Sequence, residues 1–240
     1  MLQQLTNRIY YMAGDAETDR PYLYYVYGDK YSLAVDAGSS KAHVEAFYKA
    51  IEEKGLPKPH YTVLTHWHWD HTFGLHAVEG QTIASAKTNQ KLREVKTWKW
   101  TVEAMKARER TGEDIPFCNA CIQKVYKDLG EIKVITANIE VEGTMTIDLG
   151  GVTCQIEHQD STHSRDALFI YFPEERALAI GDADSEDHYE NGGKYDKTRL
   201  LGIIAYIKQF AFDHYLLGHD KPDTKEGALS YLTAELEKLK

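Results

Sequence analysis

Cysteine is scarce in this chain of 240 residues, which contains only three. So few cysteines, and an odd number of them, exclude a scaffold held together by disulfides. Cys118 and Cys121 form a C-x-x-C pair, but no second pair and no nearby histidine completes a zinc knuckle. Two reduced structural thiols are therefore the favoured interpretation, ahead of a redox or metal-binding role. Cys154 alternates with apolar residues, which is typical of a residue in the core of a strand.

Long apolar runs and an excess of positive charge are also missing. No stretch approaches the roughly 20 apolar residues that a membrane span needs. The first residues, MLQQLTNRIYYMAG, lack the basic and apolar regions of a secretion signal, so we expect a cytoplasmic protein with no membrane segment. The net charge of −9 comes without a basic stripe, which argues against nucleic acid as a partner. A small-molecule substrate is the expected partner, and the sequence is compatible with a homo-oligomer as well as with a monomer.

The first third of the chain alternates between strand-like and helical patterns. Residues 20–38 predict two strands joined by a hairpin at Gly28 and Asp29. Ser39 or Ser40 is a suitable cap for a helix that ends near Lys54. The apolar segment HYTVLTH, residues 60–66, then predicts a short buried strand.

The rest of the chain contains a charged helical segment followed by a second region of strands. Residues 86–129 predict helices, the second beginning after Cys118, and carry too few apolar residues for a core of their own. We therefore expect one domain over residues 1–240 with a helical insertion at about 86–129. Further strands are expected at 132–136, 144–151, 152–158, 167–172, 176–182 and 214–219, and further helices at 197–210 and from 224. This order predicts an α/β fold with two packed sheets and helices outside them.

The sequence THWHWDH, residues 65–71, is the densest group of metal-binding side chains. It follows an apolar strand, where open α/β sheets build their sites. In an extended segment His66 and His68 project in the same direction and can bind one ion. If a helix begins near Asp70, then Asp70 and His71 point toward a second ion. Zinc suits such imidazole and carboxylate ligands.

Residues of the same kind stand at the ends of other apolar strands. His163 precedes ALFIYF, Asp182 ends RALAIGD, and His219 ends HYLLGH. A buried structural role is the more common explanation for any one of them alone. Their shared position and order favour a metal site.

HWHWDH, followed by His163, Gly-Asp at 182 and Gly-His at 219, resembles the metallo-β-lactamase fold superfamily of metal-dependent hydrolases. The resemblance runs from about residue 7 to residue 220 and implies a four-layer αββα sandwich with two divalent metal ions. It implies two sets of ligands bridged by one carboxylate: His66, His68 and His163 for the first ion, Asp70, His71 and His219 for the second, and Asp182 between them.

One part of the chain departs from that pattern. Around the third histidine many members have a Gly-His-Thr-Pro-Gly type of stretch, where this chain has THSRD. His158 is therefore a rival ligand. His163 is preferred because the run of two strands from it to Asp182 is kept.

The resemblance also implies a reaction. Two metals lower the pKa of a bridging water, and the hydroxide attacks an ester-like bond. Asp70 then acts as the catalytic residue that orients the nucleophile and carries its proton to the leaving group. Asp182 as the bridge resembles the glyoxalase II, lactonase and phosphodiesterase branches, not true β-lactamases. We therefore expect a dinuclear hydrolase of a thioester, lactone or phosphodiester, with zinc favoured and iron or manganese open.

The alternative is a metal-binding redox (di-iron) or structural protein without hydrolase activity, although no flavin motif is present. Several aromatic and polar residues are candidate substrate contacts: Trp69, Trp98, His188, Tyr189, Lys194 and Tyr195. Trp98 lies in the insertion, which could form a lid or simply pack onto the domain. Trp67 and Trp69, which point opposite to His66 and His68, are expected to wedge the turn against the core.

Overall fold

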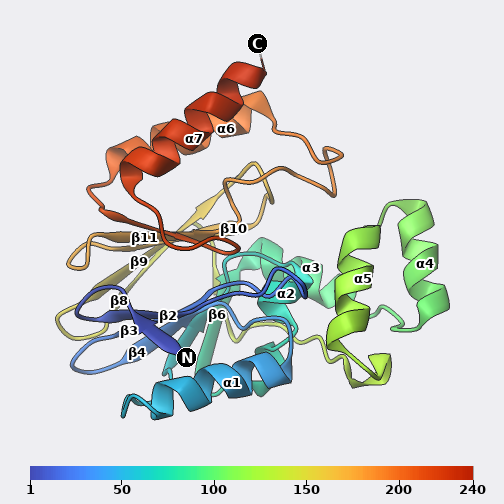
Figure 1. Ribbon diagram of the computed structural model, residues 1–240, viewed down its shortest axis with the longest axis horizontal. Coiled ribbons are helices and arrows are strands. Elements are labelled where there is room, and N and C mark those ends of the chain that lie inside the picture. Colours follow the sequence, from blue (N-terminus) through green and yellow to red (C-terminus); the bar gives the residue numbers. More distant parts are fainter. Residues whose placement is uncertain (240) are drawn as a thin grey trace.

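The computed structural model, which describes residues 1–239, has two β-sheets packed face to face with helices on both outer faces (Figure 1). The first sheet follows the chain order, antiparallel from β1 to β4 and parallel from β4 to β7. Its strands are β1 (Leu2–Gln4), β2 (Ile9–Met12), β3 (Leu23–Tyr27), β4 (Ser32–Val35), β5 (Tyr61–Val63), β6 (Gln81–Ser85) and β7 (Ile139–Val141).

The second sheet has the order β12-β11-β10-β9-β8 and is antiparallel except for the β11–β12 pair. Its strands are β8 (Thr144–Asp148), β9 (Thr153–Gln159), β10 (Ala167–Phe172), β11 (Ala177–Gly181) and β12 (His214–Leu217). Figure 1 shows this sheet above the first, with the helices α6 and α7 covering its outer side. The expected α/β sandwich of four layers is confirmed.

The helices fall into three groups. α1 (Lys41–Glu52) covers the first sheet, and α6 (Lys197–Gln209) and α7 (Lys225–Lys238) cover the second. Of the other four, α2 (Trp69–Thr72), α4 (Val102–Thr111) and α5 (Pro116–Val125) lie at one end of the sandwich, whereas α3 (Ala86–Val95) packs on β6 and β7. Short 3-10 turns lie at Leu75–Ala77 and Leu129–Glu131. No helix within residues 1–239 is both long and apolar enough to cross a bilayer.

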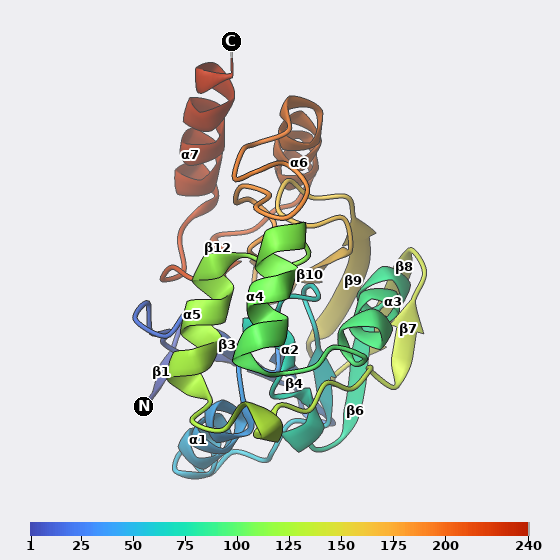
Figure 2. The same cartoon turned by 90° about the vertical axis from the view of Figure 1, so that its right-hand side faces the viewer.

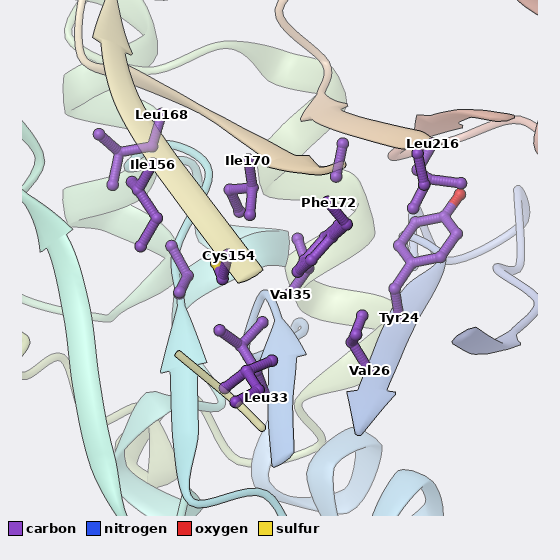
Figure 3. Packing of buried hydrophobic residues seen from close by; sticks show 14 of the residues in the cluster. Tyr24, Val26, Leu33, Val35, Cys154, Ile156, Leu168, Ile170, Phe172 and Leu216 are labelled. Atoms are coloured by element: carbon purple, nitrogen blue, oxygen red, sulfur yellow. The ribbon is translucent and has the colours of Figure 1, made fainter. Parts of the chain in front are cut away.

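The main core lies between the two sheets. Figure 3 shows Val26, Leu33 and Val35 of the first sheet facing Cys154 and Ile170 of the second. All of these side chains are buried, and burying one such aliphatic side chain contributes about 1.5–3 kcal/mol to folding. The expected place of Cys154 in a strand core is confirmed. A rigid sandwich of this kind fixes the loops at its edge, where the polar residues gather.

The first expected hairpin and helix are confirmed. β3 and β4 are antiparallel, with the turn at Gly28. Ser40 caps α1, since its hydroxyl accepts the backbone N–H of His43. The apolar side chains Val44, Phe47 and Ile51 of this helix are buried against the first sheet.

The expected strand at 132–136 is wrong. Ile132 and Val134 are buried against the helices at the end of the sandwich, which explains the alternating pattern, but the segment has no strand partner. Just beyond it, the side chain of Asn89 accepts the N–H of Ala137 (2.8 Å) and donates to its C=O (3.1 Å). An amide side chain thus satisfies backbone groups that a strand would satisfy by pairing. The nearby strand is β7, three residues long.

The charged segment 86–129 is helical, but its helices have different places. α3 packs on β6 and β7, so it serves as the crossover between parallel strands. The chain leaves helical structure at residues 98–101, and α4 and α5 form a pair beside the sandwich (Figures 1 and 2). α5 begins at Pro116, two residues before the expected Cys118, because proline is favoured in the first turn.

Candidate metal centre

The turn that follows β5 brings its polar side chains together with residues that adjoin strand ends of the second sheet. The helix α2 begins at Trp69, as expected for a helix near Asp70. The Thr72 hydroxyl donates to the C=O groups of Trp67 (3.1 Å) and His68 (2.9 Å), which ties the turn to the helix. Because the chain is extended before His68 and helical after it, the imidazoles of the two halves point to two neighbouring places.

The first group consists of His66, His68 and His163, whose ligand atoms lie within 4.8 Å of one another. His163 Nε2 is 2.9 Å from His68 Nδ1. The ring centroids of His66 and His68 are 4.4 Å apart. Three imidazoles at this spacing are the ligand set of many catalytic zinc sites.

The second group consists of Asp70, His71, Asp182 and His219, again within 4.8 Å. His71 Nε2 and His219 Nε2 each lie 3.0 Å from Asp70 Oδ2 and 3.2 Å from Asp182 Oδ2. Asp182 Oδ2 also lies 3.9 Å from His66 Nε2 and 3.7 Å from His163 Nε2. The carboxylate of Asp182 therefore faces both groups at once.

Two buried atoms in the centre have no hydrogen-bond partner within residues 1–239, namely His66 Nε2 and Asp182 Oδ1. An unpaired polar atom in the interior costs about 1–3 kcal/mol. Both atoms belong to side chains of the two groups, and imidazole nitrogen with carboxylate oxygen is a donor set that zinc accepts. The residues present fit a pair of divalent metal ions.

The far side of three of the five imidazoles is held by a second contact. His66 Nδ1 lies 3.0 Å from Thr65 Oγ1, His71 Nδ1 lies 2.8 Å from Asp36 Oδ2, and His163 Nδ1 lies 2.8 Å from the C=O of Glu186. Such partners fix the ring and leave the other nitrogen free for a ligand bond.

Asp36 and Asp19 are the residues that sequence reasoning missed. Asp36 is buried at the end of β4 and accepts the backbone N–H and the hydroxyl of Thr65. Its signal was present, since it ends an apolar strand as Asp182 does. Asp19 lies 3.7 Å from His219 Nδ1 and belongs to an irregular loop, which has no sequence signal.

Burial and charge divide the imidazoles into two kinds. Burial holds the pKa of His66, His68 and His163 below the usual value. These three rings are thus kept in the neutral form that binds a metal. Burial also acts on His71 and His219, but Asp70 and Asp182 outweigh it and raise their pKa.

Two glycines allow the two halves of the centre to meet. Gly181, with a φ of 57°, stands before Asp182, and a Cβ there would lie 2.5 Å from Thr65 Oγ1. A Cβ at Gly218, before His219, would overlap Asp182 Oδ1. The Gly-Asp and Gly-His pairs therefore have a steric cause.

A cleft of about 270 Å³ opens onto both groups. His188 and Tyr189, two of the expected substrate contacts, line it together with Ile115, Phe117 and Cys118 of the α5 region. The start of α5 thus forms one wall of the cleft.

The other expected contacts do not line this cleft. Trp69 is buried in the core beneath the ligand turn, because its helix turns the ring inward. Trp98 packs against Arg108 with a guanidinium-to-ring distance of 4.4 Å. Tyr195 is buried and its hydroxyl contacts that of Tyr231 at 2.9 Å, whereas Lys194 is exposed to solvent. Substrate contact by these four residues finds no support in their positions.

Several remaining predictions can be located as well. Trp69 packs into the core as a wedge, but Trp67 is only half-buried and lies against the ring of His68 at 4.7 Å. Cys118 and Cys121 are buried free thiols. His158, the rival ligand, is paired within β9 and its Nε2 contacts the C=O of Arg165 at 2.9 Å. It belongs to neither group.

Comparison with known proteins supports the arrangement. A family model described as the metallo-beta-lactamase superfamily matches residues 18–219. No curated protein sequence matches the chain.

Solved structures with the same fold are distant in sequence. A metallo-beta-lactamase from Pontibacter korlensis has 16% identity and a TM-score of 0.69, covering 99% of this chain and 98% of its own. The sec-alkylsulfatase Pisa1 from Pseudomonas sp. has 15% identity and a TM-score of 0.70, and covers 98% of this chain, which spans only 41% of the sulfatase. The DIM-1 metallo-beta-lactamase has 15% identity and a TM-score of 0.66, covering 100% of this chain and 98% of its own. At such identities the likeness shows the fold alone.

Proposed function

Because the chain belongs to the metallo-beta-lactamase superfamily, we propose that it is a dinuclear metal-dependent hydrolase acting on an ester-like bond of a small substrate. One observation carries this proposal: the carboxylate of Asp182 lies between two groups of ligands, with His71 and His219 at 3.2 Å and His66 and His163 within 3.9 Å. A site that only stabilised the fold would not need two neighbouring groups open to a cleft.

The ligands of the two ions follow from the two groups. His66, His68 and His163 would hold the first ion, and Asp70, His71 and His219 the second, with Asp182 shared. Zinc ions bound there would supply Lewis-acid polarisation of the scissile carbonyl or phosphoryl oxygen and an activated water. Iron or manganese would also fit these ligand types.

Asp70 is the residue best placed to handle a proton. Its carboxylate belongs to the second group and also lines the cleft. It can therefore accept a hydrogen bond from an attacking water and then carry that proton to the leaving group. The Nε2 atoms of His71 and His219 both lie 3.0 Å from Asp70 Oδ2, so an ion shared by these three side chains would keep the carboxylate in this position.

The lining of the cleft favours an uncharged ester or lactone within the wider class. Within the residues that the structure describes, no lysine or arginine lines it. An additional anionic group of the substrate would therefore have no basic side chain to pair with. Ile115 and the exposed ring of Phe117 offer an apolar surface instead.

A screen of purified, metal-loaded protein on thioesters, lactones, carboxylic esters and phosphodiesters tests this function. We expect metal-dependent turnover of at least one uncharged ester or lactone. H163A should lose that turnover together with bound metal, whereas H158A is the matched control and should keep both. Metal content below one ion per chain, without metal-dependent turnover, would exclude the proposal. A flavin or strong iron absorption band would instead support the redox alternative.

A further inference from the structure

Tyr189 lines the metal cleft and belongs to the loop between β11 and α6. Its ring centroid lies 4.9 Å from that of His68 and 4.9 Å from that of Trp67. The phenol thus packs directly on a ligand of the first group. Nothing in the ligand chemistry requires an aromatic ring there.

The position of Tyr189 is fixed from both ends. Its hydroxyl contacts Asp114 Oδ1 at 3.3 Å and Cys118 Sγ at 3.6 Å. Its backbone N–H donates to Asp187 Oδ1 at 3.0 Å, and Asp187 in turn lies 3.4 Å from the guanidinium of Arg199. Because the side chain and the backbone are both held, the ring acts as a wall.

A second cavity lies beyond that wall. It measures about 290 Å³ and shares three lining residues with the cleft of about 270 Å³, namely His68, His163 and Tyr189. Its further walls include Trp67 and charged side chains of both signs, namely Lys87, Lys91, Glu113, Arg165, Asp166, Asp187 and Glu190. The ammonium nitrogen of Lys91 lies 5.1 Å from the centroid of the Trp67 ring, so its methylene stem runs beside that ring. An aromatic ring and the aliphatic part of a lysine can pack against a hydrocarbon chain.

We propose that Tyr189 limits the length of the substrate by closing the metal cleft, and that the cavity behind it is the space a longer chain would occupy. This inference rests on the proposed function for its substrate class, an uncharged ester, but adds the residue that determines specificity. Removing the ring should join the two cavities. The protein would then accept longer chains without any change in its metal ligands.

A series of 4-nitrophenyl esters with straight acyl chains of increasing length tests the inference. Beyond the length that the cleft holds, each added methylene should lower the kcat/KM of the wild-type protein by at least about tenfold. Y189A should move this limit to longer chains, and Y189L by less. Y189F keeps the ring and should keep the wild-type limit, whatever its absolute rate. N191A, in the same loop but outside both cavity linings, controls for disturbance of the loop.

Calorimetric titration of the same metal-loaded proteins with straight-chain carboxylates provides a readout without turnover. The longest carboxylate that binds should be the same for the wild type and Y189F, longer for Y189L and longest for Y189A. A binding limit that shifts in this way, with no ester hydrolysed by the wild type, would refute the proposed function and support the role of Tyr189. An unchanged limit in Y189A with retained metal would overturn the inference. If Y189A loses metal or fold, Y189L decides in the same way.

Discussion

Replacing Asp36 by asparagine should weaken the second metal site selectively. Asp36 binds no ion in the proposed arrangement, but its Oδ2 lies 2.8 Å from His71 Nδ1 and its Oδ1 accepts the N–H of Thr65 at 2.7 Å. It is 3% exposed, so water cannot replace either contact. The carboxylate accepts the proton of His71 Nδ1 and leaves Nε2 with a free lone pair for a metal.

The magnitude follows from the geometry of the amide. In D36N the new amide oxygen accepts the N–H of Thr65, so the NH2 group of the same side chain faces His71 and donates to its Nδ1. The imidazole proton then moves to Nε2, where the metal would bind. Loss of such a supporting contact lowers metal affinity by about 10- to 100-fold, or about 1.4–2.8 kcal/mol.

The assay is a competition titration with a chromophoric zinc chelator. In D36N, one ion should bind about 10- to 100-fold more weakly, while the other keeps its affinity because His66, His68 and His163 are untouched. D29N is a matched control, since Asp29 is exposed and pairs with Arg8. Two ions bound by D36N with wild-type affinities would refute the assignment of Asp36 as the residue that orients His71.

Three further predictions concern stability. N89A should lower the free energy of unfolding, measured with urea, by about 3 kcal/mol, because it leaves the N–H and C=O of buried Ala137 unpaired. G181A should lower the free energy of unfolding by about 1–3 kcal/mol through backbone strain alone, and the added Cβ should also displace Thr65. The temperature of thermal unfolding and the metal content should therefore both fall. Burial lowers the pKa of His43 to about 3, whereas its pKa in the unfolded chain is near 6.5. Between these two pH values the imidazole takes up a proton only in the unfolded chain. The metal-free protein should therefore lose up to about 1.4 kcal/mol per pH unit between pH 6 and pH 4 through His43, and H43L should lack this part of the slope.

Each of these predictions has a contradicting result. Q90A, exposed on the same helix as Asn89, should change stability by less than about 0.5 kcal/mol, and an equal loss in both variants would contradict the role of Asn89. Full metal content in G181A would contradict the steric argument. Parallel pH slopes for H43L and wild type would show that His43 is not held neutral.

The candidate ligands could be predicted because their positions obey simple rules. His163, Asp182 and His219 each adjoin an apolar strand, and strands of one sheet bring such ends together. Asp36 gave the same signal but was not used. Asp19 could not have been found, since its loop has no periodic pattern and its position depends on packing against distant elements.

The limits of the fold prediction also have physical causes. Residues 132–136 alternate between buried and exposed as a strand does, yet periodicity does not show whether a partner strand exists. The pair of cavities on either side of Tyr189 was equally hidden, because it arises from a loop and α5 meeting across the cleft. Contacts between segments distant in sequence leave no local signal.

Ester hydrolysis measured against the number of zinc ions bound per chain tests whether the two groups of ligands form one dinuclear hydrolytic centre. Metal-free protein is titrated with zinc, and the rate on an uncharged ester is followed at each occupancy. The rate should rise steeply as the second ion binds, and D182A, which removes the shared carboxylate, should fail to reach that occupancy. A rate that stays at zero with two ions bound, or a D182A variant that binds both ions as the wild type does, would contradict a dinuclear hydrolytic centre.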